Sequence, residues 1–522
     1  MLVGVIRRLV ALLDSAGRHP TPLLVLPSIW MFWRFLPFWK DVDVVSQLLW
    51  PANESNILHA PPIYSFLGRV PFWLTDKFLS GRGPSIFAEQ HPTLTAVYTL
   101  VILQHVLLWT ALRYFLFSLP FSNRNRGIVT LMLASVASFY SFAHTCGSEA
   151  MTAVTWFLVF GAGARALTGR ATWRTWVIYA AALLLAIGSR HVNGLLATWL
   201  PITAIVLIGF RWYFRGRQFP GSVSTDARIA GLAILVSLAV IGINHSLVSY
   251  LCKRFNVIER STLGGTLSDR IATLVNHLSR VEKERLLAKV AALTSDPNVR
   301  LAIESQIMLG SYHLGTDEVI QAALEKQGLQ GEELRAEKDR IMLRATICFY
   351  ETLDPRLIAI VLKEFARGWA PTSDYRVALS GPLATFLFAR TVESEPSRWS
   401  NLPRLPMFEL PIANRMLERA KHDPFLRHWQ RIPILVWCLL FAVVGGWRMR
   451  RETLPPELLL IGLTFLGIGV AVYGATCVCV FSEPRYVLPL LVSVYAFGAI
   501  ALSKGAGQTA FRRDLDLMER PR

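Results

Sequence analysis

Long apolar runs are the feature that most restricts the folds open to this chain. A membrane offers backbone N–H and C=O groups no hydrogen bonds, so a run of about 20 apolar residues predicts a helix that satisfies them internally. Candidate runs occupy residues 22–38, 94–117, 127–143, 150–167, 176–188, 192–210, 229–251, 432–447, 456–481 and 487–502. The sequence therefore predicts an all-α polytopic membrane protein with about ten transmembrane helices.

Composition and charge agree with this prediction. Charged residues make up 17% of the chain, whereas soluble domains carry about a quarter. The net charge of +18 lies mostly in short clusters between the apolar runs, which is typical of cytoplasmic membrane rims and not of nucleic-acid binding. The 6 cysteines show no CxxC spacing, so neither a disulfide framework nor a zinc site is indicated.

Arginine and lysine predict the orientation, because cytoplasmic loops collect them. Basic clusters follow alternate apolar runs at 124–126, 170–174, 211–217, 448–451 and 504–513. Both termini are then cytoplasmic. Residues 176–210 could form one long helix, but merging them would turn the clusters at 448–451 and 512–513 outward, so we expect two helices joined at 189–194.

The resulting division of the chain has five parts. We expect an amphipathic cytoplasmic segment at 1–20, helices one to seven at 21–252 with a first outer loop at 39–92, an extracytoplasmic insert at 253–430, helices eight to ten at 431–503, and a cytoplasmic tail at 504–522. The insert is rich in charge and mainly helical by its apolar spacing. Asp354-Pro355 predicts the start of one of its helices, and Gly368 its end.

Ionisable residues gather at the predicted outer helix ends. Asp41 and Asp43 follow the first helix, and Glu149 and Glu483 lie at two later helix mouths, where charge is costly unless it is paired or hydrated. Outer-face partners include Lys40, Arg69, Arg190 and Arg485. A solvated rim would also carry some charge, but we interpret the convergence as an active site. The Asp-x-Asp pair leaves a divalent metal open, because hard cations bind carboxylate oxygens.

Several short motifs resemble a known family. They are His59-Ala60-Pro61-Pro62-Ile63-Tyr64 after the Asp pair, Ser148-Glu149-Ala150 at the fourth helix, the turn containing Arg190 and Asn193, and Glu483-Pro484-Arg485-Tyr486-Val487-Leu488-Pro489 before the last helix. Their order and topology are similar to the GT-C superfamily of membrane glycosyltransferases, nearest to its protein mannosyltransferase and aminoarabinose transferase-like branch. The chain departs from that pattern in having Asp-Val-Asp, where the family often has Asp-Glu.

The resemblance implies a mechanism and a location. A sugar would pass from a polyprenyl-phosphate donor to a lipid, glycan or protein acceptor on the outer side of a bacterial inner (plasma) membrane. Asp43 is the expected general base, with Asp41 as the alternative. Arg485 and Arg190 would hold the donor phosphate. The remaining expected substrate-binding residues are His59, Glu149, Asn193, Glu483 and Tyr486.

Two other functions stay open at this point. An O-antigen ligase or polymerase also has many helices and a large outer loop, but would be expected to keep its key Arg and His residues in that loop. A lipid or solute transporter predicts internal repeats and broken or charged helices at mid-membrane. The sequence shows no such repeat, and its ionisable residues cluster at helix ends.

Overall fold

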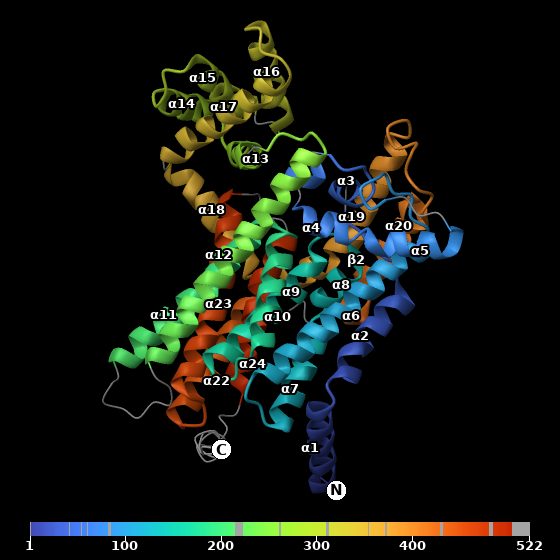
Figure 1. The fold of residues 1–522 in the computed structure, drawn as a ribbon, viewed down its shortest axis with the longest axis vertical. Helices are drawn as coiled ribbons and strands as arrows, with labels where there is room; N and C mark the ends of the chain where they lie inside the picture. Colours follow the sequence, from blue (N-terminus) through green and yellow to red (C-terminus); the bar gives the residue numbers. More distant parts are fainter. Residues whose placement is uncertain are drawn as a thin grey trace.

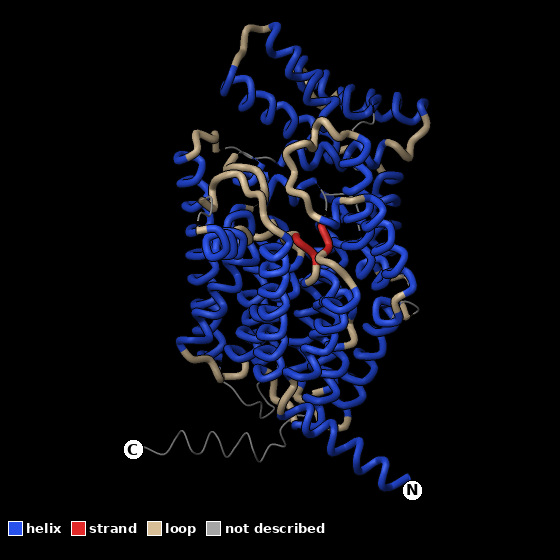
Figure 2. The backbone as a smooth tube through the Cα atoms, turned by 90° about the vertical axis from the view of Figure 1, so that its right-hand side faces the viewer, coloured by secondary structure: helices blue, strands red, loops and turns tan. Residues whose placement is uncertain are grey.

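In the computed structural model, most of the described residues are helical (Figure 1). The described residues are 2–40, 42–53, 55–59, 61–81, 85–213, 223–259, 263–309, 313–352, 354–370, 373–427, 432–479 and 484–503. Within them, strands are limited to β1 (Phe38–Trp39) and β2 (Thr145–Cys146), which pair in parallel. Figure 2 places this pair where the long helical bundle meets the loops beneath the insert.

Every predicted apolar run coincides with helical structure. The helices are α2 (Thr21–Arg34), α6 (Leu94–Ser118), α7 (Asn123–Ala134) with α8 (Ala137–Ala143), α9 (Ala150–Leu167), α10 (Trp173–Ile187), η2 (His191–Leu195) with α11 (Leu196–Tyr213), α12 (Val223–Arg254), α22 (Ile434–Arg450), α23 (Pro456–Cys479) and η5 (Pro484–Val487) with α24 (Leu488–Leu502). The all-α, multi-pass architecture is thereby confirmed.

The helices differ in whether they can cross a membrane unaided. Six of those described are long and apolar enough to do so, and α7 with α8 makes a seventh if this pair, bent by 60°, is one span. The other three, α2, α10 and α22, have 14, 15 and 17 residues. Prolines and short polar breaks thus make several of the runs shorter than about 20 helical residues.

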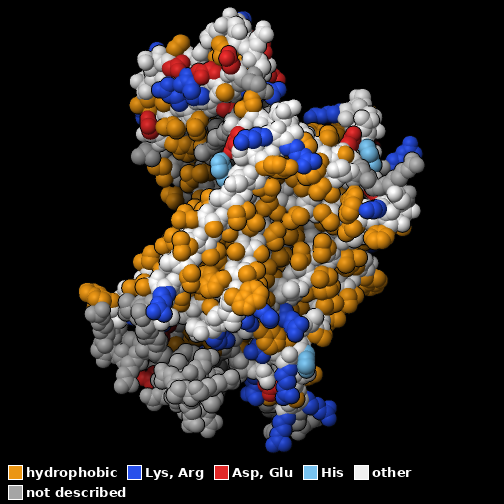
Figure 3. Space-filling model, viewed as in Figure 1, with side chains coloured by type: hydrophobic (Ala, Val, Ile, Leu, Met, Phe, Trp, Pro, Cys, Tyr) orange, Lys and Arg blue, Asp and Glu red, His pale blue; other side chains and the backbone are white. Residues whose placement is uncertain are grey.

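The helices pack as a bundle whose outer surface is apolar. On the face drawn in Figure 3, apolar side chains form a broad belt across the middle of the bundle, with basic side chains below this belt. On α12, Leu235 and Leu238 are 65% and 61% exposed. By contrast, α9 and α24 are buried over almost their whole apolar length, as the central helices of the bundle. Apolar residues covering both the interior and the exterior are expected where lipid replaces water.

Residues 176–210 form two helices, as the sequence predicts. Helix α10 ends at Ile187, and the chain reverses through η2 into α11. Contacts at opposite ends of the bundle show that α9 and α10 are antiparallel. Arg190, just after α10, lies beside Glu149 at the start of α9, whereas Arg174 at the start of α10 shares a groove with Arg165 near the end of α9.

Short helices cover the end of the bundle nearest the insert, which we call the insert end. They are α3 (Val42–Leu48), the π-helix η1 (Ser55–His59), α4 (Pro62–Leu67) and α5 (Val70–Ser80), all from the predicted first outer loop. Helix α5 crosses the top of α6 in Figure 1. At the opposite end, α1 (Leu2–Arg18) packs against α7, where a side-chain carbon on Gly17 would collide with the backbone of Asn123.

The predicted insert contains two groups of helices with different cores. The first group is α13 (Leu263–Val275), α14 (Arg280–Ala291), α15 (Pro297–Glu304), η3 (Ser305–Leu309), α16 (His313–Lys326), α17 (Gly331–Glu351) and α18 (Pro355–Gly368). Its apolar side chains form a cluster of their own. The second group is α19 (Ser373–Ser394), η4 (Pro406–Phe408), α20 (Leu410–His422) and α21 (Pro424–Arg427), whose apolar residues join the core of the membrane bundle.

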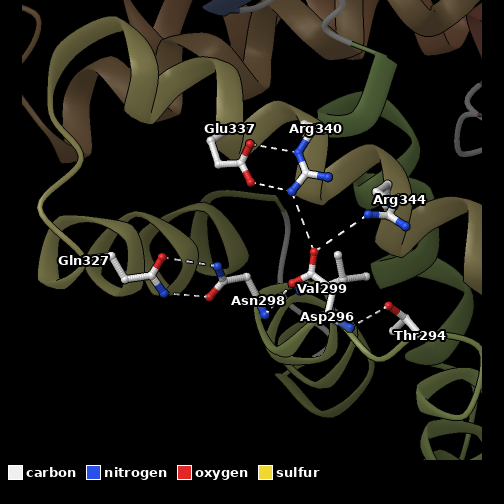
Figure 4. Close-up of polar contacts among 8 residues, drawn as sticks. All are labelled: Thr294, Asp296, Asn298, Val299, Gln327, Glu337, Arg340 and Arg344. Atoms are coloured by element: carbon white, nitrogen blue, oxygen red, sulfur yellow. Dashed lines mark hydrogen bonds and ion pairs between the residues drawn. The ribbon is translucent and has the colours of Figure 1, made fainter.

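Local capping explains where helices of the first group begin. Asp354 caps α18 by accepting a hydrogen bond from the Arg356 backbone N–H at 3.0 Å, and the helix ends at Gly368, as predicted from the sequence. Asp296 caps α15 in the same way, and its Oδ2 lies 3.6 Å from Arg340 and 3.8 Å from Arg344 of α17 (Figure 4). One carboxylate thus both starts a helix and links it to its neighbour.

Candidate active site at the insert end of the bundle

The short strand pair brings together two loops that are far apart in the sequence. Strand β1 follows α2, and β2 follows α8, with Phe38 opposite Thr145 and Trp39 opposite Cys146. The Phe38 N–H donates to the His144 carbonyl at 2.9 Å, and the Lys40 N–H donates to the Cys146 carbonyl at 3.4 Å. This register sets Lys40 beside the turn that leads to Glu149 at the start of α9.

A buried tyrosine and glutamine brace that turn. The Tyr64 hydroxyl donates to Gln104 Oε1 at 3.0 Å and accepts from the Gly147 N–H at 2.9 Å. The Gln104 amide donates to the carbonyls of Ala143 and Thr145, both at 3.0 Å. Tyr64 belongs to the Pro-Pro-Ile-Tyr motif. The motif therefore helps to position Glu149, because Tyr64 fixes the backbone of the turn before this residue.

Glu149 is the centre of a cluster of basic side chains. Its side chain is 2% exposed, and its Oε1 lies 2.8 Å from Lys40 Nζ. Arg190 Nη1 and Arg485 Nε each lie 3.9 Å from the same oxygen, with 11% of either side chain exposed. The cations come from three different elements: the loop after β1, the turn before η2, and η5. We call Lys40, Glu149, Arg190 and Arg485 the Glu149 cluster.

The surrounding cations keep Glu149 ionised. Burial by itself would raise its pKa, but the positive charges of Lys40, Arg190 and Arg485 outweigh burial and hold the pKa well below the usual range. The second oxygen, Oε2, is buried with no hydrogen-bond partner among the described residues. A side chain on Gly147 would press against it, because a Cβ there would lie 3.0 Å from Oε2.

Tyr486 organises the two guanidinium groups. The guanidinium carbon of Arg190 lies 4.9 Å from the centre of the Tyr486 ring, and that of Arg485 lies 5.1 Å from it. Arg485 also donates from Nη2 to the Tyr486 hydroxyl at 3.3 Å. Guanidinium groups stack favourably on aromatic faces. The Tyr486 ring thus holds both arginines close to Glu149 while leaving each of them partly exposed.

Asp43 lies at the exposed edge of the Glu149 cluster. It occupies the first turn of α3, and 64% of its side chain is exposed. Its Oδ2 lies 3.8 Å from Lys40 Nζ, so Lys40 stands between an exposed carboxylate and a buried one. The structure therefore brings together Asp43, Glu149, Arg190, Arg485 and Tyr486 of the residues expected from the sequence.

Other expected residues are placed differently or lie outside the described part. Asn193 is fully buried, accepts a hydrogen bond from Trp156 Nε1 at 3.1 Å and donates to the Ala186 carbonyl at 3.0 Å, which ties α9 to α10. His59 ends the π-helix η1, and nothing is described of its side chain. Asp41 and Glu483 lie outside the described residues, which contain no group of three or more possible metal ligands.

Arg69, an outer-face partner by sequence, has a structural role. It is fully buried and donates to the backbone carbonyls of Gln47, Ile86 and Ala88. Burial lowers its pKa to about 9. Gln104 was not expected from the sequence. Its polar side chain within an apolar helix is the signal that could have revealed it, because a buried amide needs hydrogen-bond partners.

Comparison with known proteins gives one solved structure. No protein-family model matches the chain, and no curated protein matches it in sequence. The chain is similar to the archaeal oligosaccharyltransferase AglB from Archaeoglobus fulgidus, a GT-C glycosyltransferase that was solved with an inhibitory peptide and a dolichol-phosphate. The similarity has a TM-score of 0.39 at 11% identity and covers 97% of this chain and 53% of AglB, so the chain spans about half of AglB's length.

Proposed function

We propose that this chain is a membrane glycosyltransferase that transfers a sugar from a polyprenyl-phosphate donor to an acceptor hydroxyl at the insert end of the bundle. The observation that carries the proposal is the Glu149 cluster with Asp43 beside it. Two arginines held by one tyrosine ring lie near an exposed carboxylate, at the end of membrane helices.

The two arginines suit a phosphate ligand that belongs to a lipid. A guanidinium group offers a planar fork of N–H donors that matches phosphate oxygens, and such bonds strengthen where water is scarce. Arg190 and Arg485 are 11% exposed, so each is shielded but still reachable. A phosphate attached to a polyprenyl chain can reach this depth while its chain stays among the lipids around the bundle.

Glu149 has a positioning role in this proposal. With its oxygen 2.8 Å from Lys40 and 3.9 Å from each arginine, it draws three cations from separate elements to one point. A buried carboxylate that stays ionised can do this without taking a proton from the reaction. The arginines are then fixed before the donor arrives, which reduces the reorganisation needed in the transition state.

Asp43 is the proposed general base. The acceptor hydroxyl oxygen forms a bond to the anomeric carbon of the sugar, and its proton passes to the Asp43 carboxylate. The bond between the anomeric carbon and the phosphate oxygen breaks, and the electron pair leaves with the polyprenyl phosphate. Arg190 and Arg485 stabilise the charge that develops on that phosphate. No metal ion is required by this sequence of steps.

A lipid analysis tests the proposal. Cells lacking the chain should accumulate a polyprenyl-phosphate sugar, detectable by mass spectrometry of lipid extracts, and the wild-type chain should remove it. Asp43→Asn keeps the shape of the side chain but cannot accept the proton, so its transfer rate should fall by about a hundredfold or more. Glu89→Gln is the matched control, because Glu89 lies in the same loop, is 48% exposed and pairs with His91 at 3.7 Å.

The outcomes separate the candidate bases. An active Asp43→Asn with an inactive Asp41→Asn would move the role of base to Asp41. Full activity in both variants, at normal protein levels, would contradict a glycosyltransferase that uses this loop. Absence of any accumulating lipid-linked sugar in the deletion strain would contradict the proposed donor.

A further inference from the structure

A groove at the end of the bundle opposite the Glu149 cluster is lined by basic and aromatic side chains. Its volume is about 520 Å³. Tyr114 of α6, Arg165 of α9, and Thr172, Trp173, Arg174 and Thr175 around the start of α10 line it. Arg165 lies 16 residues after Glu149, at the far end of α9. At 1.5 Å per residue this separation is roughly 24 Å, close to the thickness of a hydrocarbon core.

Arginines dominate the charge of the groove. Arg165 and Arg174 line it, and none of the described acidic side chains does. Arg165 donates from Nε to Ser118 Oγ at 3.0 Å and from Nη2 to the Phe117 carbonyl at 3.5 Å, and its guanidinium carbon lies 5.0 Å from the Tyr114 ring centre. These contacts hold the group in place, but each partner is neutral.

Two further arginines beside the groove follow the same pattern. Arg170 donates to the Ser118 carbonyl, and Arg126 donates to the carbonyls of Gly17 and Phe121. Among the described residues, no carboxylate lies within 4.0 Å of Arg126, Arg165, Arg170 or Arg174, whereas their neighbour Arg124 has Asp14 at 3.8 Å. Four positive charges therefore converge near the end of α6 without an anion from the described part of the chain.

The surroundings indicate where the missing anion comes from. Trp173 is 71% exposed at the rim of the groove, which is typical of an aromatic side chain at a membrane–water interface. Figure 3 shows basic side chains directly below the apolar belt. Helix α10 also begins at this end of the bundle, and the positive end of its dipole favours an anion. A ligand here would have its charge in the groove and its apolar part in the belt.

We propose that this groove is a binding site for the phosphate headgroup of an anionic membrane lipid, distinct from the site of sugar transfer. Basic pockets between transmembrane helices bind such headgroups. The phosphate lies between Arg165 and Arg174, the threonine hydroxyls donate to it or to the glycerol oxygens, and the acyl chains run along α6 and α10. The lipid supplies the negative charge that the described residues lack.

The test compares lipids on the purified full-length protein. Phosphatidylglycerol, phosphatidylcholine and soluble glycerol phosphate are each added in neutral detergent, and bound lipid is counted by native mass spectrometry with the melting temperature as a second readout. Phosphatidylglycerol should be retained and should raise the melting temperature, whereas phosphatidylcholine and glycerol phosphate should not. Replacing Arg165 and Arg174 by Gln should weaken retention by about fivefold for each charge removed.

Matched variants keep the result interpretable. Arg450→Gln with Arg451→Gln removes two charges from the same end of the bundle, at the close of α22, and should leave retention unchanged. If the Arg165 variant is poorly folded, lipid retention is measured for the single variant Arg174→Gln, because Arg174 is exposed. Equal loss in both double variants would mean a general surface attraction and would overturn the site. An equal effect of glycerol phosphate would show a soluble phosphate site instead of a lipid site.

Discussion

At the scale of single residues, Arg485 carries the most specific part of the proposed function. It lies 3.9 Å from Glu149 through Nε and donates to the Tyr486 hydroxyl through Nη2. Lysine would keep the charge but lose the forked pair of donors that fits a phosphate. We expect Arg485→Lys to lower the transfer rate by roughly tenfold and Arg485→Ala by roughly a hundredfold or more, as measured by clearance of the accumulated lipid-linked sugar.

A control variant distinguishes phosphate binding from simple anchoring. Arg398 is 64% exposed and pairs with Glu395, so Arg398→Ala should leave the transfer rate unchanged. If Arg485→Lys were as active as the wild type, Arg485 would be an interface anchor, for which charge alone is sufficient. Near-normal transfer by Arg485→Ala at normal protein levels would exclude the phosphate role altogether.

The ionised state of Glu149 makes the free energy of unfolding depend on pH. Its pKa in the folded state is lower than the usual value of about 4.3, because Lys40, Arg190 and Arg485 outweigh the effect of burial. A depressed pKa adds stability above the unfolded-state pKa, and this contribution is lost as the pH falls through and below about 4. Glu149→Gln should therefore lower the free energy of unfolding at pH 7 by about 3–5 kcal/mol, the cost of breaking a buried ion pair.

Thermal unfolding in detergent between pH 7 and pH 3.5 measures this effect. The melting temperature of the wild type should fall at the acid end of the range, and that of Glu149→Gln should start lower and fall less. Glu89→Gln, at a position 48% exposed, serves as the comparison and should follow the wild type. Parallel curves for Glu149→Gln and the wild type would contradict the ionised state proposed for Glu149.

At the scale of elements, α19 supports the strand pair. The Trp39 N–H donates to Thr385 Oγ1 of α19 at 2.8 Å. At Gly381, one turn earlier on the same helix, a Cβ would lie 2.5 Å from Thr145 Oγ1 and 3.0 Å from the Phe38 ring. Helix α19 therefore touches β1 and β2 together, at a position where only glycine fits.

Adding one methyl group should disturb the site through this contact. Gly381→Ala would push the strands away from α19 and shift Lys40 relative to Glu149, so we expect at least a tenfold lower transfer rate and about 1–3 kcal/mol of overpacking cost. Gly242→Ala in α12 is the control and should behave as the wild type, because the added carbon would meet nothing described within 4 Å beyond the adjacent backbone of its own helix. Equal transfer rates of the two variants would contradict the role of α19 in positioning the strand pair.

The elements themselves were largely predictable. Each of the ten apolar runs is helical over most of its described length. The split of 176–210 was predicted because one merged helix would turn the basic clusters at 448–451 and 512–513 outward. The bend of 60° between α7 and α8 was not predicted. The helices α2, α10 and α22, with 14, 15 and 17 residues, lie in runs that are already short in the sequence. Apolar composition reports which residues prefer lipid, but it does not report where a helix bends inside the bilayer.

At the scale of the whole molecule, the orientation in the membrane stays a prediction. The basic loops put α16 and the rest of the insert on the outer side. A cysteine at Ala322, an exposed position on α16, should react with an impermeant maleimide in intact cells, with Cys348 replaced by Ser to remove background. A cysteine at Ala171, exposed at the opposite end, should react only after permeabilisation. The reverse labelling pattern would mean that the insert faces the cytoplasm. It would contradict both the predicted orientation and the proposed site of transfer on the outer side.

The sequence by itself determined the membrane class, the helical runs and the carboxylates and arginines worth testing, because apolar length and charge position are local properties of the chain. Only the tertiary structure decided which of these residues meet. A parallel pair of two-residue strands joins positions more than 100 residues apart and sets Lys40 beside Glu149. The reversal at η2 brings Arg190 to the same carboxylate, and η5 adds Arg485. Such meetings depend on packing and register between distant segments, which no local pattern encodes.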